Sequence, residues 1–122
     1  MALTKVTAAV LNDDAVSYDK LGAEFTTAAA VAASAVDFST AQVFTKTLTA
    51  DTTLTFSNVA TGMVKDLVIT GAHALVLPAS VKVISGTYDG AVSNLIQIAV
   101  TNGSTEQWAT ISKQATYWQQ KQ

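Results

Sequence analysis

A period-two pattern of apolar and polar residues runs from about Val36 to Lys113, and threonine fills many of the polar positions. Successive residues of a β-strand point to opposite faces, so this period predicts strands with one buried face. Threonine is β-branched, which favours extended backbone, and its hydroxyl tolerates water without adding charge. The pattern therefore predicts a mainly β domain with an outer surface rich in threonine.

Seven short strands follow from the alternation and from the turn residues between them. Pro78 ends the fourth strand because it cannot donate a backbone hydrogen bond, and Asn102-Gly103 is typical of a two-residue type I′ hairpin turn. Short strands separated by such turns predict an antiparallel β-sandwich or barrel-like domain. The expected strands are Phe44–Thr49, Asp51–Asn58, Met63–Thr70, Ala74–Leu77, Val81–Ile84, Leu95–Val100 and Glu106–Ser112.

The first 36 residues have a different pattern. Asn12, Asp13 and Asp14 are good helix N-caps, although the apolar residues after them fit a helical stripe poorly. The alanine-rich run Thr26–Val36 predicts a short helix that is apolar on nearly every side, and a flexible linker is an equally open interpretation. We expect an anchoring or oligomerisation arm over residues 1–36 and a β domain with an aromatic tail over residues 37–122.

Charge excludes several classes of partner. The chain has 13 % charged residues, about half the usual share, and it has seven lysines with no arginine. Its scattered lysines do not form the basic cluster that nucleic-acid binding requires. No apolar stretch is long enough to span a membrane, and the first residues do not resemble a signal peptide, so we expect synthesis in a cytoplasm without membrane or nucleic-acid partners.

Residues for catalysis or metal binding are sparse. Cysteine is absent, and the single histidine, His73, follows a glycine in an expected turn. Asp13-Asp14 is explained by helix capping and Asp89-Gly90 by turn formation. No metal-binding, phosphate-binding or nucleophile motif occurs, so we expect neither an enzyme nor a cofactor or metal site.

Aromatic side chains leave two interpretations open. Tyr88, Trp108, Tyr117 and Trp118 could stack on a sugar, as in a carbohydrate-binding module. The alternative, which we prefer, is that Trp108 closes the core hairpin and the others fill an interface. Tyr117 and Trp118 then cover a core edge or contact a partner chain.

Two stretches of the expected β domain carry a recognisable pattern. The first is the run Phe44–Asn58 followed by Gly62, and the second is Leu77-Pro78 through Val81 to Gly86-Thr87-Tyr88, closed by Asn94–Ile98. Together they resemble a module of tailed-bacteriophage structural proteins. The opening residues, through Asp14–Leu21, are similar to the start of phage fibre proteins. The resemblance covers about residues 36–113 and carries no catalytic or ligand-binding residues. It implies a virion subunit that is typically a homotrimer.

The expected function is that of a structural protein in a phage virion. The first expectation is a homotrimeric capsid decoration (cement) protein or short head fibre, which is made in the host cytoplasm and stabilises the capsid surface. Its partners would be other copies of the chain and the major capsid protein or other virion proteins; a tail fibre or tail adaptor subunit is the alternative. Small apolar side chains allow close approach of neighbouring chains. The candidate interface residues are Ala28, Ala29, Ala30, Val31, Ala33, Tyr117 and Trp118.

Overall fold

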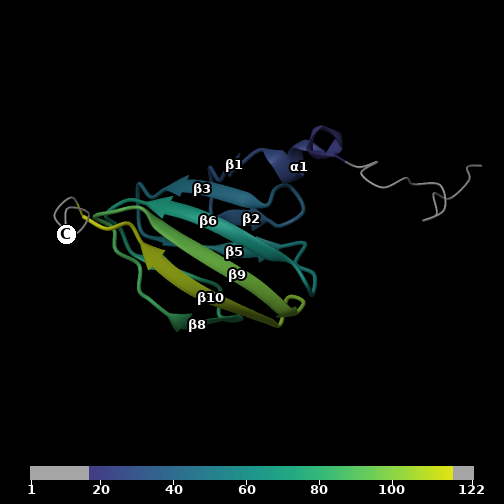
Figure 1. Ribbon diagram of the computed structural model, residues 1–122. Coiled ribbons are helices and arrows are strands. Elements are labelled where there is room, and N and C mark those ends of the chain that lie inside the picture. Colours follow the sequence, from purple (N-terminus) through teal and green to yellow (C-terminus); the bar gives the residue numbers. More distant parts are fainter. Residues whose placement is uncertain (1–16, 117–122) are drawn as a thin grey trace, which may run out of the picture.

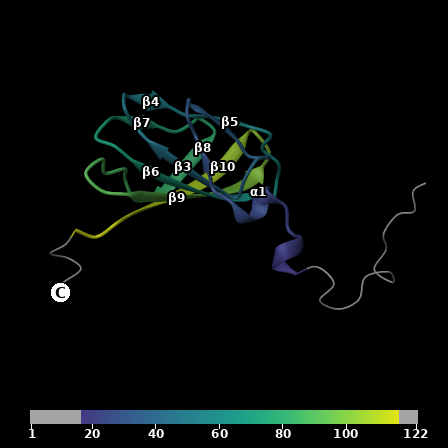
Figure 2. The same cartoon turned by 90° about the horizontal axis from the view of Figure 1, so that it is seen from above.

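The computed structural model describes residues 17–116, and these form a mainly β domain as the sequence predicts (Figure 1). Two short helical elements come first, a 3₁₀-helix at Tyr18–Lys20 and α1 at Ala23–Thr26. In both views α1 lies at one end of the domain, and the end of the last strand lies at the other (Figures 1 and 2).

Within residues 17–116, ten strands form one large sheet and two small ones. The large sheet has the order β1-β3-β6-β9-β10-β8, and the small sheets are β2-β5 and β4-β7. The strands are β1 (Ala29–Ala30), β2 (Ala35–Asp37), β3 (Val43–Thr47), β4 (Thr52–Thr53), β5 (Thr55–Ser57), β6 (Val64–Thr70), β7 (Leu75–Val76), β8 (Val81–Ser85), β9 (Asn94–Asn102) and β10 (Glu106–Lys113).

The first seven strands are arranged like the coils of a short solenoid. β1, β3 and β6 are parallel neighbours, and so are the pairs β2 with β5 and β4 with β7. Each strand therefore lies beside the equivalent strand of the next coil, as when Phe44 pairs with Leu67. The antiparallel strands β9 and β10 then extend the large sheet, and β8 pairs with β10 in parallel.

Parallel pairing corrects the predicted antiparallel sandwich or barrel. Only β6 with β9 and β9 with β10 pair antiparallel among the described strands, whereas five pairs are parallel. A parallel pair needs a long crossover connection. The segment between β3 and β6 supplies one because it contains β4 and β5, which occupy the other two sheets.

The core lies inside the coils and under β9 and β10. Phe38 has its ring centroid 6.2 Å from that of Phe44 and 4.8 Å from that of Phe56, so these three rings connect neighbouring strands and loops. Ile96, Ile98 and Val100 of β9 are buried, as their alternation in the sequence predicts, and Leu67 and Ile69 share the buried face of β6. The buried apolar residues are Val36, Phe38, Ala41, Phe44, Leu48, Leu54, Leu67, Ile69, Ile96, Ile98, Val100 and Ala109.

The alanine-rich run is extended, so the helix predicted for Thr26–Val36 is wrong. α1 ends at Thr26, and β1 and β2 follow it inside the range predicted as an arm. Tertiary pairing overrides the helix propensity of alanine, which is a weak preference. The backbone N–H of Val31 donates to the Thr45 carbonyl at 2.8 Å, and β1 lies beside β3. The same pairing excludes a free linker for this segment.

The β9–β10 hairpin has a longer turn than predicted. β9 ends at Asn102 and β10 begins at Glu106, which leaves three residues in the loop instead of two. Gly103 has a φ of 51°, and the Thr105 N–H donates to the Asn102 carbonyl at 3.0 Å. A register shift between Glu106 and Gln107 accommodates this loop.

Gly86, directly after β8, makes a close backbone contact that yields a stability prediction. It has a φ of 82°, and a Cβ atom there would overlap the Ile111 carbonyl oxygen. We expect Gly86→Ala to lower the free energy of unfolding by at least about 3 kcal/mol, measured by chemical denaturation. The control is Gly103→Ala, where φ is also positive but the space is open. It should cost only about 1 kcal/mol, and equal losses would contradict the steric explanation.

Candidate interaction sites

The alanine-rich segment lies on an edge of the large sheet. Ala28, Ala30 and Ala33 are exposed, whereas Ala29 and Val31 are half-buried and pack against the core. The structure thus brings the five predicted interface residues of this segment together along β1. The other two, Tyr117 and Trp118, lie outside the described residues.

Lys46, on β3, holds this segment in place. Its Nζ donates to the carbonyl oxygens of Ala33 at 2.6 Å, Val31 at 3.3 Å and Ala32 at 3.4 Å. An ammonium group has three N–H donors, so these acceptors can use all of them. The sequence prediction missed this role, although Lys46 occupies an inward position of the alternation between Phe44 and Leu48.

The short helices expose large apolar side chains. Tyr18 is 72 % exposed, Leu21 40 % and Phe25 51 %. These residues are three and then four positions apart, and they precede Ala28 and the edge strand β1 in the chain. Contact of such side chains with another surface is favourable, because it removes apolar area from water. This segment is therefore a candidate contact region that the sequence prediction did not single out.

An open groove of about 780 Å³ lies between α1 and the β domain. Its walls come from α1, from the loop between β2 and β3, and from the loop that enters β6. Phe25, Phe38 and Met63 make part of it apolar. Lys65 also lines it, although this side chain is only 5 % exposed. The groove thus combines apolar side chains with a buried cationic side chain, and the exposed carboxylate of Glu24 and several polar residues also line it.

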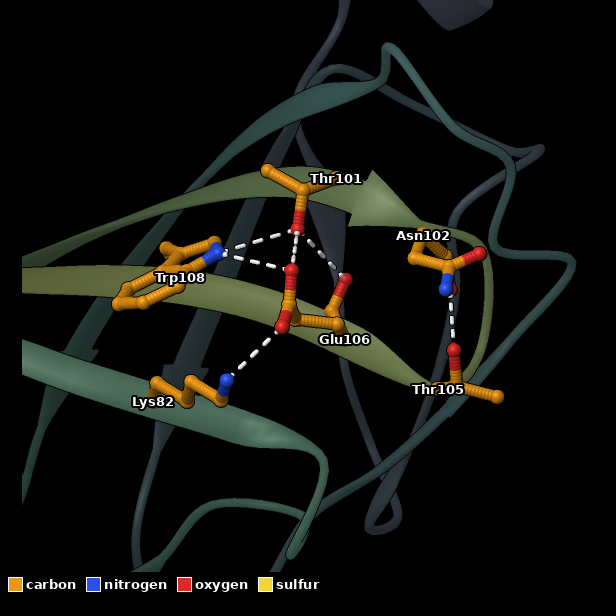
Figure 3. Close-up of polar contacts among 6 residues, drawn as sticks. All are labelled: Lys82, Thr101, Asn102, Thr105, Glu106 and Trp108. Atoms are coloured by element: carbon orange, nitrogen blue, oxygen red, sulfur yellow. Dashed lines mark hydrogen bonds and ion pairs between the residues drawn. The ribbon is translucent and has the colours of Figure 1, made fainter.

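A polar cluster around Trp108 joins β8, β9 and β10 (Figure 3). Glu106 accepts hydrogen bonds from Lys82 Nζ at 2.8 Å and from Thr101 Oγ1 at 2.6 Å. The indole N–H of Trp108 donates to Thr101 Oγ1 at 3.0 Å and to Glu106 Oε1 at 3.3 Å. Lys82 Nζ also lies 4.8 Å from the centre of the Trp108 ring, within cation–π range.

Trp108 does not close the core, which corrects the preferred sequence interpretation. Its neighbours Gln107 and Ala109 are buried, whereas Trp108 is half-buried and points to the opposite face of β10. The cluster uses the polar atoms of Trp108 and Glu106 internally. Tyr88 is likewise engaged, because its hydroxyl donates to the Gly71 carbonyl at 2.6 Å, and burial raises the pKa of that hydroxyl. These contacts do not present the two aromatic residues as a joint sugar-binding platform.

His73 lies in an exposed turn next to Asp51. The distance from His73 Nδ1 to Asp51 Oδ1 is 3.7 Å, and the same oxygen accepts the Ala74 N–H at 3.0 Å. Within residues 17–116, no group of three or more His, Asp or Glu side chains is arranged to hold a metal ion. Neither helix of that range has the length and apolar character needed to cross a bilayer.

Comparisons with protein-family models, curated protein sequences and solved structures returned no match.

The Glu106 cluster predicts a loss of stability in acid. Hydrogen bonds from Lys82, Thr101 and Trp108 lower the pKa of Glu106 from 4.5 to about 2. Between these values the unfolded chain binds more protons than the folded chain, so the free energy of unfolding falls as the pH falls from 4.5 to 2. We expect Glu106→Gln to remove part of this loss while lowering stability at neutral pH, measured by denaturation across pH.

Glu24→Gln serves as the control because it removes a carboxylate from α1, outside the cluster. That variant should retain the wild-type loss between pH 4.5 and 2. A Glu106→Gln variant with the same acid dependence as the wild type would contradict the role assigned to Glu106.

Proposed function

We propose that this chain is a structural subunit of a phage virion, in the form of a homotrimeric capsid decoration (cement) protein or short head fibre. The observation that carries the proposal is the exposed contact region formed by Tyr18, Leu21 and Phe25 together with the edge strand β1. Exposed apolar side chains beside an unpaired strand edge favour coverage by other chains. The resemblance of residues 36–113 to phage structural modules indicates that the assembly is a phage virion.

The edge strand gives the trimer a physical basis. Among the described strands, β1 pairs with β3 alone, and Ala28 and Ala30 beside this edge are exposed. Small side chains allow a neighbouring backbone to approach closely, and a symmetric assembly covers the same edge in every copy. Lys46 keeps residues 31–33 against β3, so a neighbour would meet a positioned surface.

Location on the particle tests the function. Cryo-microscopy of virions should reveal density for the domain in many copies on the capsid surface. Density in small multiples at the tail would instead support the tail fibre or tail adaptor alternative. A chain that is absent from purified virions would contradict both assignments.

Charged substitutions on the alanine edge test the trimer. We expect Ala30→Asp and Ala33→Asp each to shift the native mass from trimer towards monomer, because an unpaired carboxylate would be buried at a dry interface. Sedimentation velocity measures the mass, and circular dichroism checks that the domain remains folded. Ala79→Asp, at an exposed position between β7 and β8, is the matched control and should leave the trimer intact.

Two results would contradict this arrangement. An unchanged trimer in both edge variants would exclude the alanine segment from the interface. A wild-type chain that is monomeric at micromolar concentration would remove the trimer itself.

A further inference from the structure

Lys65 is a buried cation with neutral partners. It lies on β6, is 5 % exposed, and its Nζ donates to the Ala41 carbonyl at 2.8 Å and to Gln42 Oε1 at 3.2 Å. Both acceptors are uncharged. Four ion pairs join side chains within residues 17–116, and Lys65 belongs to none of them. A buried charge is costly unless an opposite charge compensates it.

Within residues 17–116, no carboxylate forms an ion pair with Lys65. Asp66 follows Lys65 on β6 and therefore points to the opposite face of the sheet. In the described part of the chain, Asp66 forms no ion pair with Lys65, and its buried Oδ1 atom has no hydrogen-bond partner. Glu24 lines the same groove as Lys65, but it is exposed on α1 and forms no ion pair with Lys65.

Lys46 differs from Lys65 because each N–H of its ammonium group has a carbonyl acceptor. Three carbonyl oxygens accept from Lys46 Nζ, whereas two acceptors serve Lys65 Nζ. Among the described residues, one N–H of Lys65 thus has no protein acceptor. Burial lowers the pKa of the Lys65 ammonium, in the direction expected for a cation that lacks an anionic partner.

The surroundings of Lys65 define what could supply that acceptor. The groove that it lines has a volume of about 780 Å³ and opens between α1 and the loops around β6. Phe25, Phe38 and Met63 give it apolar walls. A site of this volume is larger than a single small ion needs and matches a ligand of several groups, such as a short peptide segment. Glu24 also lines the groove but is exposed on α1, so the buried cation and the apolar side chains beside it suit an acidic residue flanked by apolar ones.

We propose that the groove under α1 binds an acidic side chain of a partner protein, presented by a short apolar peptide segment, and that Lys65 pairs with its carboxylate. A charge-assisted hydrogen bond to the remaining N–H would compensate the buried charge, and the flanking side chains would cover Phe25 and Met63. This inference deepens the proposed function. Only the identification of the partner as a virion protein rests on that function, and the binding of an acidic segment does not.

Matched peptides test the pairing in solution. The probes are N-acetyl-Leu-Glu-Leu-amide and its neutral analogue N-acetyl-Leu-Gln-Leu-amide, titrated into the full chain and followed by NMR. We expect the Glu peptide to bind at least about tenfold more tightly, with shifts confined to residues of the groove. Binding of the Glu peptide should also raise the pKa of Lys65, followed through its side-chain resonances in the wild-type protein.

Variants separate the roles of the groups in the groove. Lys65→Met should abolish the tenfold preference for the Glu peptide, whereas Lys113→Met, which removes one positive charge from an exposed position, should retain it. The pKa measurement uses the wild-type chain, so the proposal remains testable if Lys65→Met does not fold.

Three outcomes would overturn the proposal. Equal binding of the two peptides would exclude carboxylate recognition. An acetate titration that shifts Lys65 as strongly as the Glu peptide, at equal concentration, would indicate a site for small anions instead. A change in the pKa of Lys65 in Glu24→Gln without peptide would assign the ammonium to the chain's own carboxylate. All are measured on the isolated protein, so they can fail while the virion assignment holds, and the reverse.

Discussion

Parallel backbone pairing between successive coils is the constraint on which the rest of the domain depends. β3 lies between β1 and β6, so its backbone groups bond to a neighbouring coil on both sides. This pairing draws the alanine-rich segment into the sheet and directs Phe38, Phe44 and Phe56 into one core. It also leaves β1 with one unpaired side, which is where the proposed trimer contact lies.

The sequence predicted the strands better than their partners. Alternation located the buried face of β9 and separated the two faces of β6, because that signal is local and each strand has one face in the core. Strand direction depends instead on which segments meet in space. The crossover between β3 and β6 is occupied by β4 and β5, which also resemble strands in the sequence, so an antiparallel series of seven strands fitted the pattern equally well.

Candidate sites were harder to predict, because they depend on which groups the polar ends of long side chains contact in the folded structure. Lys46 and Lys65 both occupy inward positions of strands, where the alternation predicts apolar residues. Only the fold shows that one reaches three carbonyls of the alanine segment and the other reaches the groove. The aromatic residues illustrate the same limit, since Trp108 lies on the outer face of a hairpin that the sequence located correctly.

The few charged residues of the domain differ in how completely their charged groups are hydrogen-bonded. Glu106 is surrounded by donors from three residues, and Lys46 by three acceptors, so both stabilise the domain from within. Lys65 is also buried, but it lines an open groove, and one of its N–H donors has no protein acceptor among the described residues. A surface rich in threonine and alanine offers little electrostatic guidance to a partner, so a buried cation beside apolar side chains, in a groove whose one carboxylate (Glu24) is exposed, can determine where an acidic segment binds.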